Sequence, residues 1–150
     1  MREIHSLQEL KSLIGQEVAT SDWVEISQER INMFAEATGD LQWIHIDVER
    51  AKRESPFGGP IAHGFLTLSL LPMLTANAIH QSDVKMGVNY GLNKVRFTSP
   101  VPAGSKVRAR MKLLNVEDIT GGAQMNWEVT IEREGSDKPA CVAESISRRY

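Results

Sequence analysis

Asp40 and His45 are the two residues of this sequence whose types and spacing best suit catalysis. Gly39 is expected to end a helix just before them, so both side chains lie on the loop that follows. A folded turn of five residues can point a carboxylate and an imidazole into one cavity. Two such groups can hold one water molecule, one taking its proton while the other serves a substrate. Considered without other information, the same two residues also fit a turn or N-cap aspartate and a surface histidine.

One predicted helix leads into this pair, and an irregular loop follows it. Ser27 can N-cap the helix, which carries apolar residues on one face and ends at Gly39. The loop over 40–59 holds one short helical piece, capped by Asp47, and ends in a segment rich in glycine and proline. Because long loops in compact domains are often functional, this loop is the expected place for a site.

A second predicted helix, over 64–79, is apolar on nearly every side. A helix of that kind must be wrapped by other structure. Pro72 lies in its interior and should kink the helix or force a local break. Nearer the N-terminus, the sequence predicts a short helix that opens on a capping box at Ser6 and stops at Gly15. A short strand over 22–26 follows it.

The second half of the sequence has the two-residue period of β-strands. Apolar and polar residues alternate there, as in strands with one buried face and one wet face. Short glycine-bearing connections at 102–104 and 120–122 suit an antiparallel meander. One apolar helix followed by such strands predicts an α+β fold, with an antiparallel sheet curled around a long central helix. The strands are expected at 88–99, 107–113, 125–131 and 140–147.

Length, charge and cysteine content limit the class of protein. The 150 residues favour a single domain over 1–150 that can bury a core. Lys and Arg number 17 and Asp and Glu 19, so no basic surface suits nucleic acid or a membrane. The longest apolar stretch is too short to span a bilayer. Cys141 stands alone and is expected to be a small buried residue, which agrees with a reducing, cytoplasmic location.

The segment around the Asp–His pair resembles the motif of the MaoC-like dehydratase family, which includes the (R)-specific enoyl-CoA hydratases. That motif runs approximately Gly-Asp-x-Asn-Pro-apolar-His, and Gly39, Asp40, Ile44 and His45 match it. Gln42-Trp43 stands where Asn-Pro is usual in the family. A nodulation-protein-N-like subgroup of the family looks similar at this point. The departure bears on the shape of the loop, on the volume of the pocket and on the acyl preference.

Two later segments extend the resemblance. Gly-Pro-Ile-Ala-His-Gly at 59–64 is similar to the family's approach to its central helix. The segment 95–101, with Gly104 after it, resembles the strand and turn that follow that helix. The resemblance covers roughly residues 27–112, and the order of its elements agrees with the order predicted from periodicity.

The resemblance implies a hot-dog fold, a homodimer, and the reversible syn addition of water to a trans-2-enoyl thioester, giving the (3R)-hydroxyacyl thioester. It implies that Asp40 and His45 are the catalytic pair. It implies that the backbone N–H of Gly64 meets the thioester oxygen at a helix N-terminus. It also implies that Ser69 supports the catalytic carboxylate with a hydrogen bond. The substrate would be a thioester of coenzyme A or of an acyl carrier protein, with no metal and no other cofactor.

Several alternatives stay open from the sequence. The chain could be a catalytically silent hot-dog protein that binds acyl thioesters, or a hot-dog thioesterase. Gly64 could be a packing glycine, and the Ser69 hydroxyl could bond back to a main-chain carbonyl. His63 is expected to be a structural histidine beside the site, since no cysteine or second histidine stands at metal-ligand spacing from it.

Overall fold

An antiparallel sheet forms the larger part of the molecule, whose computed structural model describes residues 1–150. Its strands are β2 (Glu17–Thr20), β3 (Val24–Glu25), β5 (Gly87–Arg96), β6 (Lys106–Ile119), β7 (Gly122–Arg133) and β8 (Cys141–Arg149). They are hydrogen-bonded in the order β2-β6-β7-β8-β5, and β3 pairs with the start of β6. The expected α+β class is confirmed.

The alternating pattern of β6 and β7 places one face of the sheet in the core. Arg108 and Glu132 lie opposite each other in the register and form an ion pair on the other face, with Arg108 Nε 2.8 Å from Glu132 Oε2. The inner face packs into a cluster of 27 buried residues. The inward side chains of the two strands are Val107, Ala109, Met111, Leu113, Met125, Trp127, Val129 and Ile131, all buried.

Only part of the sheet is a meander. β6, β7 and β8 are sequential neighbours, and Gly121, with a φ of 80°, forms the expected turn between β6 and β7. The connection at 102–104 does not join hydrogen-bonded neighbours, because β5 pairs with β8 at the opposite side of the sheet from β6. The expectation of a hairpin-like turn at 102–104 was therefore wrong. Strand pairing across the chain decides the order, and local turn residues do not reveal it.

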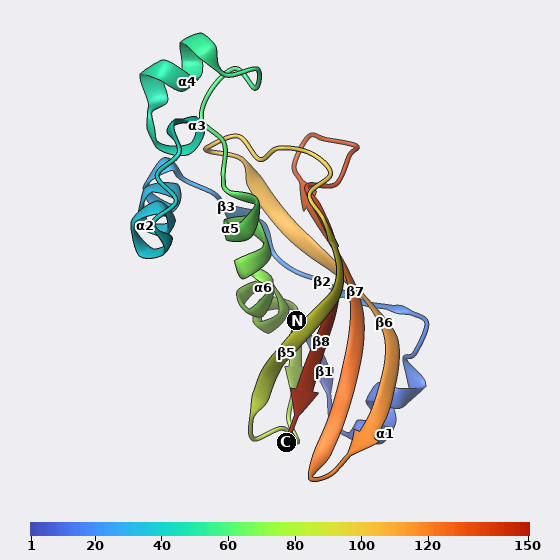
Figure 1. Ribbon diagram of the computed structural model, residues 1–150. Coiled ribbons are helices and arrows are strands. Elements are labelled where there is room, and N and C mark those ends of the chain that lie inside the picture. The colour runs from blue at the N-terminus through green and yellow to red at the C-terminus, as the bar shows by residue number, and fades with distance from the viewer.

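The long central helix is two helices. They are α5 (Gly64–Ser69) and α6 (Leu71–Ala78), and Pro72 lies in the first turn of α6. Proline has no N–H to donate and its ring clashes with the carbonyl four residues before it, so the helix breaks at Leu70 as expected. Figure 1 shows the pair lying along the hollow side of the curved sheet. Leu66, Leu71 and Leu74 join the buried cluster from these helices.

The predicted helix caps are present. α1 (Leu7–Ser12) begins after Ser6, whose Oγ accepts from the N–H of Glu9 at 3.1 Å. α2 (Gln28–Thr38) begins after Ser27, whose Oγ accepts from the N–H of Arg30 at 3.1 Å. Gly39 ends α2 in the left-handed region, with a φ of 78°. A residue with a side chain is strained there, so the glycine sets where the chain turns away from the helix.

The loop after α2 contains two short helices, where one was expected. They are α3 (Trp43–Ile46) and α4 (Val48–Glu54). Asp47 caps α4 as predicted, its Oδ1 accepting from the N–H of Arg50 at 3.0 Å. Figure 1 shows α3 and α4 beyond the end of α5, away from the main body of the sheet.

A small parallel pair of strands was not predicted. It joins β1 (Arg2–Ile4) at the N-terminus to β4 (Ile79–Gln81), which directly follows α6. Each strand has three residues, too few to show a two-residue period in the sequence. None of the helices is both long and apolar enough to cross a membrane.

Candidate active site

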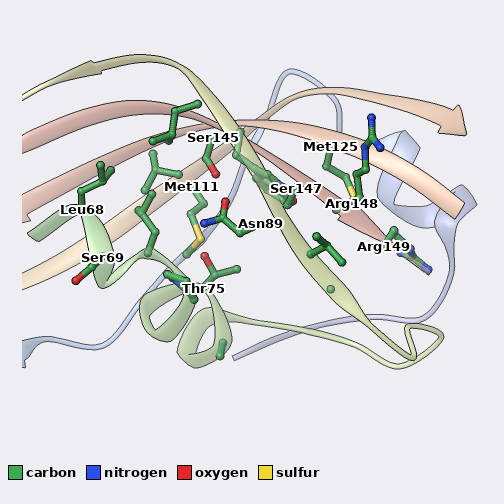
Figure 2. A pocket seen from close by; sticks show the side chains of 18 of the residues that line it. Leu68, Ser69, Thr75, Asn89, Met111, Met125, Ser145, Ser147, Arg148 and Arg149 are labelled. Carbon is green, nitrogen blue, oxygen red and sulfur yellow. The ribbon is translucent and has the colours of Figure 1, made fainter. Parts of the chain in front are cut away.

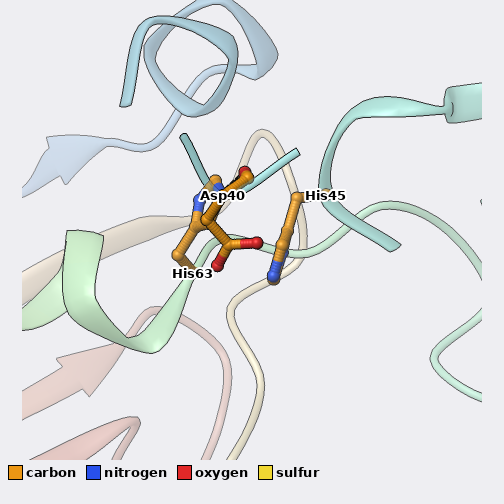
Figure 3. A group of neighbouring side chains, drawn as sticks. All are labelled: Asp40, His45 and His63. Atoms are coloured by element: carbon orange, nitrogen blue, oxygen red, sulfur yellow. Dashed lines mark hydrogen bonds between the residues drawn. The ribbon is translucent and has the colours of Figure 1, made fainter. Parts of the chain in front are cut away.

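Asp40 and His45 come together with a third residue, His63. The turn at Gly39 releases the chain from α2, so Asp40 lies at the start of the loop, while His45 lies on α3. His63 precedes α5 as its N-cap. One polar side-chain atom from each of the three lies within 4.8 Å of the other two (Figure 3). The structure therefore brings the predicted pair into one cluster, with Asp40 exposed and the two histidines buried.

His45 is held as a neutral base. Its Nδ1 lies 2.7 Å from the main-chain oxygen of Ile61, and because a carbonyl can only accept, Nδ1 carries the proton and donates. The lone pair of the neutral ring is then on Nε2. Burial lowers the pKa of His45 below its ordinary value of 6.5; the Ile61 carbonyl opposes this, His63 adds to it, and Asp40 opposes it. The ring is therefore ready to accept a proton at neutral pH.

Ile61 and Gln28 hold His45 in place from two directions. Besides accepting from the imidazole, Ile61 donates its N–H to the carbonyl of Ile44 at 3.1 Å. From the other side, Gln28 of α2 donates its side-chain amide to the carbonyl of His45 at 2.8 Å. The sequence contained no local sign of these contacts, because the partners lie 16 and 17 positions away from His45.

His63 holds the main chain of Asp40. Its Nε2 lies 3.0 Å from the carbonyl oxygen of Asp40, so this nitrogen carries the proton and donates. The ring stacks on His45, with 3.9 Å between centroids and 25° between planes, and it meets Phe34 of α2 at 4.9 Å. His63 is 2% exposed, and its Nδ1 is buried without a hydrogen-bond partner. His63 was expected beside the site, but its hydrogen bond to Asp40 was not predicted from the sequence.

The geometry of the cluster is unfavourable for a metal ion. Metal ligands must aim their lone pairs at one point, and the lone pairs of an imidazole lie in the plane of its ring. The rings of His45 and His63 are stacked 25° from parallel, so their in-plane lone pairs do not converge. The Nε2 of His63 is also engaged with Asp40. The expectation that the protein uses no metal stays a prediction that these contacts favour.

Gly64 begins α5 and packs closely against Phe97. The first main-chain hydrogen bond of α5 runs from Thr67 to the carbonyl of His63 at 3.2 Å, so the N–H of Gly64 precedes the hydrogen-bonded turn. A Cβ at Gly64 would lie 3.0 Å from the Phe97 ring. The packing reason for a glycine is therefore present, and it leaves the N–H available to a ligand.

Ser69 does not contact Asp40 in the structure. Its hydroxyl donates to the carbonyl of Leu66 at 2.7 Å, one turn back along α5. The expected hydrogen bond to the Asp40 carboxylate is absent, and the structure shows the alternative, a hydrogen bond back to the main chain. A helical serine reaches that carbonyl without any change in the backbone. Ser69 instead lines a cavity next to the cluster.

That cavity lies between the two central helices and the sheet (Figure 2). Its volume is about 800 Å³, within the range of pockets that hold small molecules. Phe34, Thr38, Phe65 and Ser69 line its end nearest the cluster. Asp40, His45 and His63 do not themselves line it, but Phe34 contacts both the cavity and His63. The rest of the lining is largely apolar, as an acyl chain requires.

Cys141 takes no part in the cluster. It is fully buried in β8, and burial raises the pKa of its thiol to about 11. A thiol with that pKa stays protonated at neutral pH and is a poor nucleophile. The expectation of a small buried residue is confirmed.

A neutral buried imidazole and a carboxylate thus lie together beside an apolar cavity, at one end of a sheet that curves around a broken central helix. A model described as "MaoC like domain" matches residues 9–134, and the chain belongs to that family. The resemblance seen in the motifs is thus confirmed.

Three relatives are informative. The chain is 55% identical to 3-hydroxyacyl-thioester dehydratase Z of Mycobacterium tuberculosis, over 99% of this chain and 98% of that one. It is 47% identical to nodulation protein N of Rhizobium meliloti, over 98% and 92% of the two chains. Among solved structures, the (R)-hydratase from A. caviae involved in PHA biosynthesis superposes with a TM-score of 0.72 at 22% identity, over 89% and 94%. The last likeness confirms the hot-dog fold.

Proposed function

We propose that this chain is a 3-hydroxyacyl-thioester dehydratase that also runs in reverse, as an (R)-specific enoyl-CoA hydratase. The observation that carries the proposal is the state of His45. Its Nδ1 proton is engaged with Ile61, burial keeps the ring neutral, and the carboxylate of Asp40 lies in the same cluster. The names of the 55% identical relative and of the (R)-hydratase agree with this class of reaction.

In the hydration direction, one water molecule adds across the double bond next to the thioester. Its oxygen bonds to the β-carbon, a proton bonds to the α-carbon, and the carbon–carbon π bond is lost, so no redox partner is needed. Nε2 of His45 is the group free to take a proton from the water. Asp40 positions the water and shares the handling of the proton at the α-carbon. Syn addition requires that both groups act on the same side of the double bond, and their placement in one cluster is compatible with that.

Negative charge gathers on the thioester oxygen as the water adds. We assign the N–H of Gly64 to that oxygen, because it lies in the first turn of α5, ahead of the first hydrogen bond of the helix. Ser69 is kept as a residue that lines the acyl cavity. Coenzyme A and an acyl carrier protein both fit as carriers of the thioester.

The proposed assembly is a cytoplasmic homodimer. β5 is the edge strand of the sheet, with ten residues and no partner on its outer side. Val88, Tyr90 and Leu92 on this strand are all exposed. A long edge with exposed apolar side chains pairs readily with another chain. Light scattering of the purified protein at micromolar concentration should give twice the mass of the chain.

The direct test is the hydration of crotonyl-CoA, followed by loss of the enoyl absorbance. Asp40→Asn should lower kcat by at least about 10²-fold, since a general acid–base group contributes on that order. Asp47→Asn is the matched control: it makes the same chemical change in the same segment, and asparagine caps a helix as well as aspartate does. Full activity in Asp40→Asn, or no turnover of any enoyl chain length, would refute the proposal.

The two alternatives are separated by simple measurements. A thioesterase releases free thiol from the acyl-CoA, which a thiol reagent detects, whereas a hydratase releases none. A silent binding protein was suggested by Gln42-Trp43 in place of Asn-Pro. Trp43, however, packs against the guanidinium of Arg50 at 4.3 Å and does not line the cavity. Gln42 does not line the cavity either, so neither side chain of the departure occupies it.

A further inference from the structure

Most of the cavity lining is apolar, but one end of the cavity is formed by a charged residue. Ser69 lines the end nearest the catalytic cluster, and Figure 2 shows Arg149 at the opposite end. Arg149 is only 6% exposed, although its guanidinium is always charged. A buried charge at the end of an apolar cavity needs partners, and these partners decide how firmly that end is closed.

Arg149 is held by two side chains from the segment that follows α6. Its Nη1 lies 2.6 Å from Oε1 of Gln81, at the end of β4, and its Nη2 lies 2.5 Å from Oδ1 of Asp83, in the turn after β4. Breaking a buried ion pair is strongly unfavourable, because the buried charge is left without a partner. Asp83 and the adjacent Ser82 are exposed, so solvent lies beyond the ion pair. Arg149, Gln81 and Asp83 thus form an end wall between the cavity and the solvent.

The main chain holds the end wall in place from two directions. Ser82 donates its N–H to the carbonyl of Ile4 at 3.1 Å, next to the pairing of β1 with β4. Met86 donates its N–H to the carbonyl of Tyr150 at 3.1 Å and accepts from the N–H of Tyr150 at 2.9 Å. The segment that carries Asp83 is therefore tied to β1 on one side and to the end of β8 on the other.

The side of the cavity formed by β8 carries small residues before it reaches the end wall. Ser145 and Ser147 line the cavity and lie on the same face of β8 as Arg149. Neither side chain is large enough to close the cavity, whereas that of Arg149 is. Successive residues on one face of a strand are about 6.6 Å apart. An extended alkyl chain advances about 1.3 Å per bond, so one such step along β8 corresponds to about five bonds.

We infer that Arg149, held by Asp83 and Gln81, sets the greatest length of acyl chain that the cavity accepts. The inference rests on the proposed function and names a residue that determines specificity at that site. With the thioester at Gly64, the acyl chain runs along α5, α6 and β8 towards Arg149, and each carbon placed before the end wall is removed from water. A longer chain must push Arg149 away from Asp83, which the ion pair opposes.

The experiment measures kcat/KM for 2-enoyl-CoA substrates of increasing even chain length, each divided by the value for crotonyl-CoA in the same preparation. This ratio removes differences in the amount of folded protein. In the wild type the ratio should fall at least about tenfold from one length to the next, where the chain first meets Arg149. We call this point the length limit. In Asp83→Ala/Arg149→Ala it should move to chains longer by about four carbons or more, since an arginine side chain beyond Cβ spans about that many bonds.

Two further variants move the end of the cavity in the other direction. Ser147→Leu fills a position one step before Arg149, and Ser145→Leu fills the position one step earlier. Ser147→Leu should lower the length limit, and Ser145→Leu should lower it by about four to six carbons more. Both variants keep the ion pair of Asp83 with Arg149, so they decide the inference even if the double alanine variant does not fold.

The matched control is Arg108→Ala/Glu132→Ala. It removes an ion pair of the same kind from the outer face of the sheet, where neither residue lines the cavity. This variant should keep the wild-type length limit. Calorimetric titration with saturated acyl-CoA of the same lengths measures the limit as a loss of affinity, without requiring turnover.

Each outcome decides one of the two claims. No turnover of crotonyl-CoA by the wild type overturns the proposed function, and the calorimetric series then tests the end wall by itself. A wild type that accepts every length without a fall, or a double alanine variant with the wild-type length limit, overturns the inference. Leucine variants that leave the limit unchanged overturn it as well, because the acyl chain would then not run along β8.

Discussion

Replacing His63 with phenylalanine should lower activity without lowering stability. Phenylalanine keeps an aromatic ring between Phe34 and His45, but it cannot donate to the carbonyl of Asp40. The wild-type ring also carries an unpartnered buried acceptor at Nδ1. That orphan atom is unfavourable in the folded protein, and phenylalanine removes it. The substitution therefore removes a hydrogen bond that positions Asp40, and it also removes an unpartnered buried nitrogen that destabilises the folded protein.

The magnitudes follow from these two contacts. A neutral hydrogen bond contributes about 1 kcal/mol net, roughly a fivefold change in the population of the correctly held loop. We expect kcat to fall about fivefold, with little change in KM because His63 does not line the cavity. An unpaired buried acceptor costs about 1–3 kcal/mol. The free energy of unfolding should therefore stay level or rise.

The assay pairs steady-state kinetics on crotonyl-CoA with urea unfolding of the same preparations. His63→Gln is the matched variant: it retains an N–H donor toward Asp40 but loses the ring that stacks on His45. It should keep more of the wild-type kcat than His63→Phe and unfold at lower urea. A His63→Phe enzyme with wild-type kcat would refute the positioning role. A fall in kcat that merely follows a fall in stability would refute it equally.

Three more outcomes are expected. Because burial lowers the pKa of His45, the acid limb of kcat/KM plotted against pH should lie below pH 6.5. The free energy of unfolding should also decrease as the pH falls below 6.5, because the unfolded chain binds the proton more readily than the folded protein does. Gly64→Ala should lower the free energy of unfolding only slightly, because the Phe97 ring that the new Cβ would meet at 3.0 Å is exposed and can move aside, and Phe97→Ala should remove that loss in the double variant. Leu74→Ala removes a fully buried side chain and should lower that free energy by about 2–5 kcal/mol in denaturant titrations, whereas Met33→Ala at an exposed position should change it little.

Elements governed by local chemistry were predictable from the sequence. Ser27 and Gly39 bracket α2 because a cap and a left-handed glycine act on neighbouring residues only. The alternation in β6 and β7 is a local period, and Pro72 breaks the central helix because its ring clashes with the preceding turn. In each case the physical cause lies within a few residues of its effect.

Features that depend on distant partners were not predictable. β1 and β4 have three residues each, and they become strands only because they pair with each other across the chain. The position of β5 beside β8, and not beside β6, is likewise a matter of long-range pairing. In the site, the contact of His63 with Asp40 spans 23 positions. The pair itself was found because its two members are close in sequence and resemble a known motif.

The cross-chain contacts show which residues around Gln42-Trp43 hold the Asp–His pair in place. Three hydrogen bonds tie the loop to the segment before α5: His63 to Asp40, His45 to Ile61, and Ile61 back to Ile44. None of them uses residue 42 or 43, whose side chains lie outside the cluster. The side chains at 42 and 43 therefore do not hold the pair in place. The main chain of Gln42 does contact both members: its N–H lies 3.4 Å from Asp40 Oδ1, and its carbonyl accepts from the N–H of His45 at 3.0 Å.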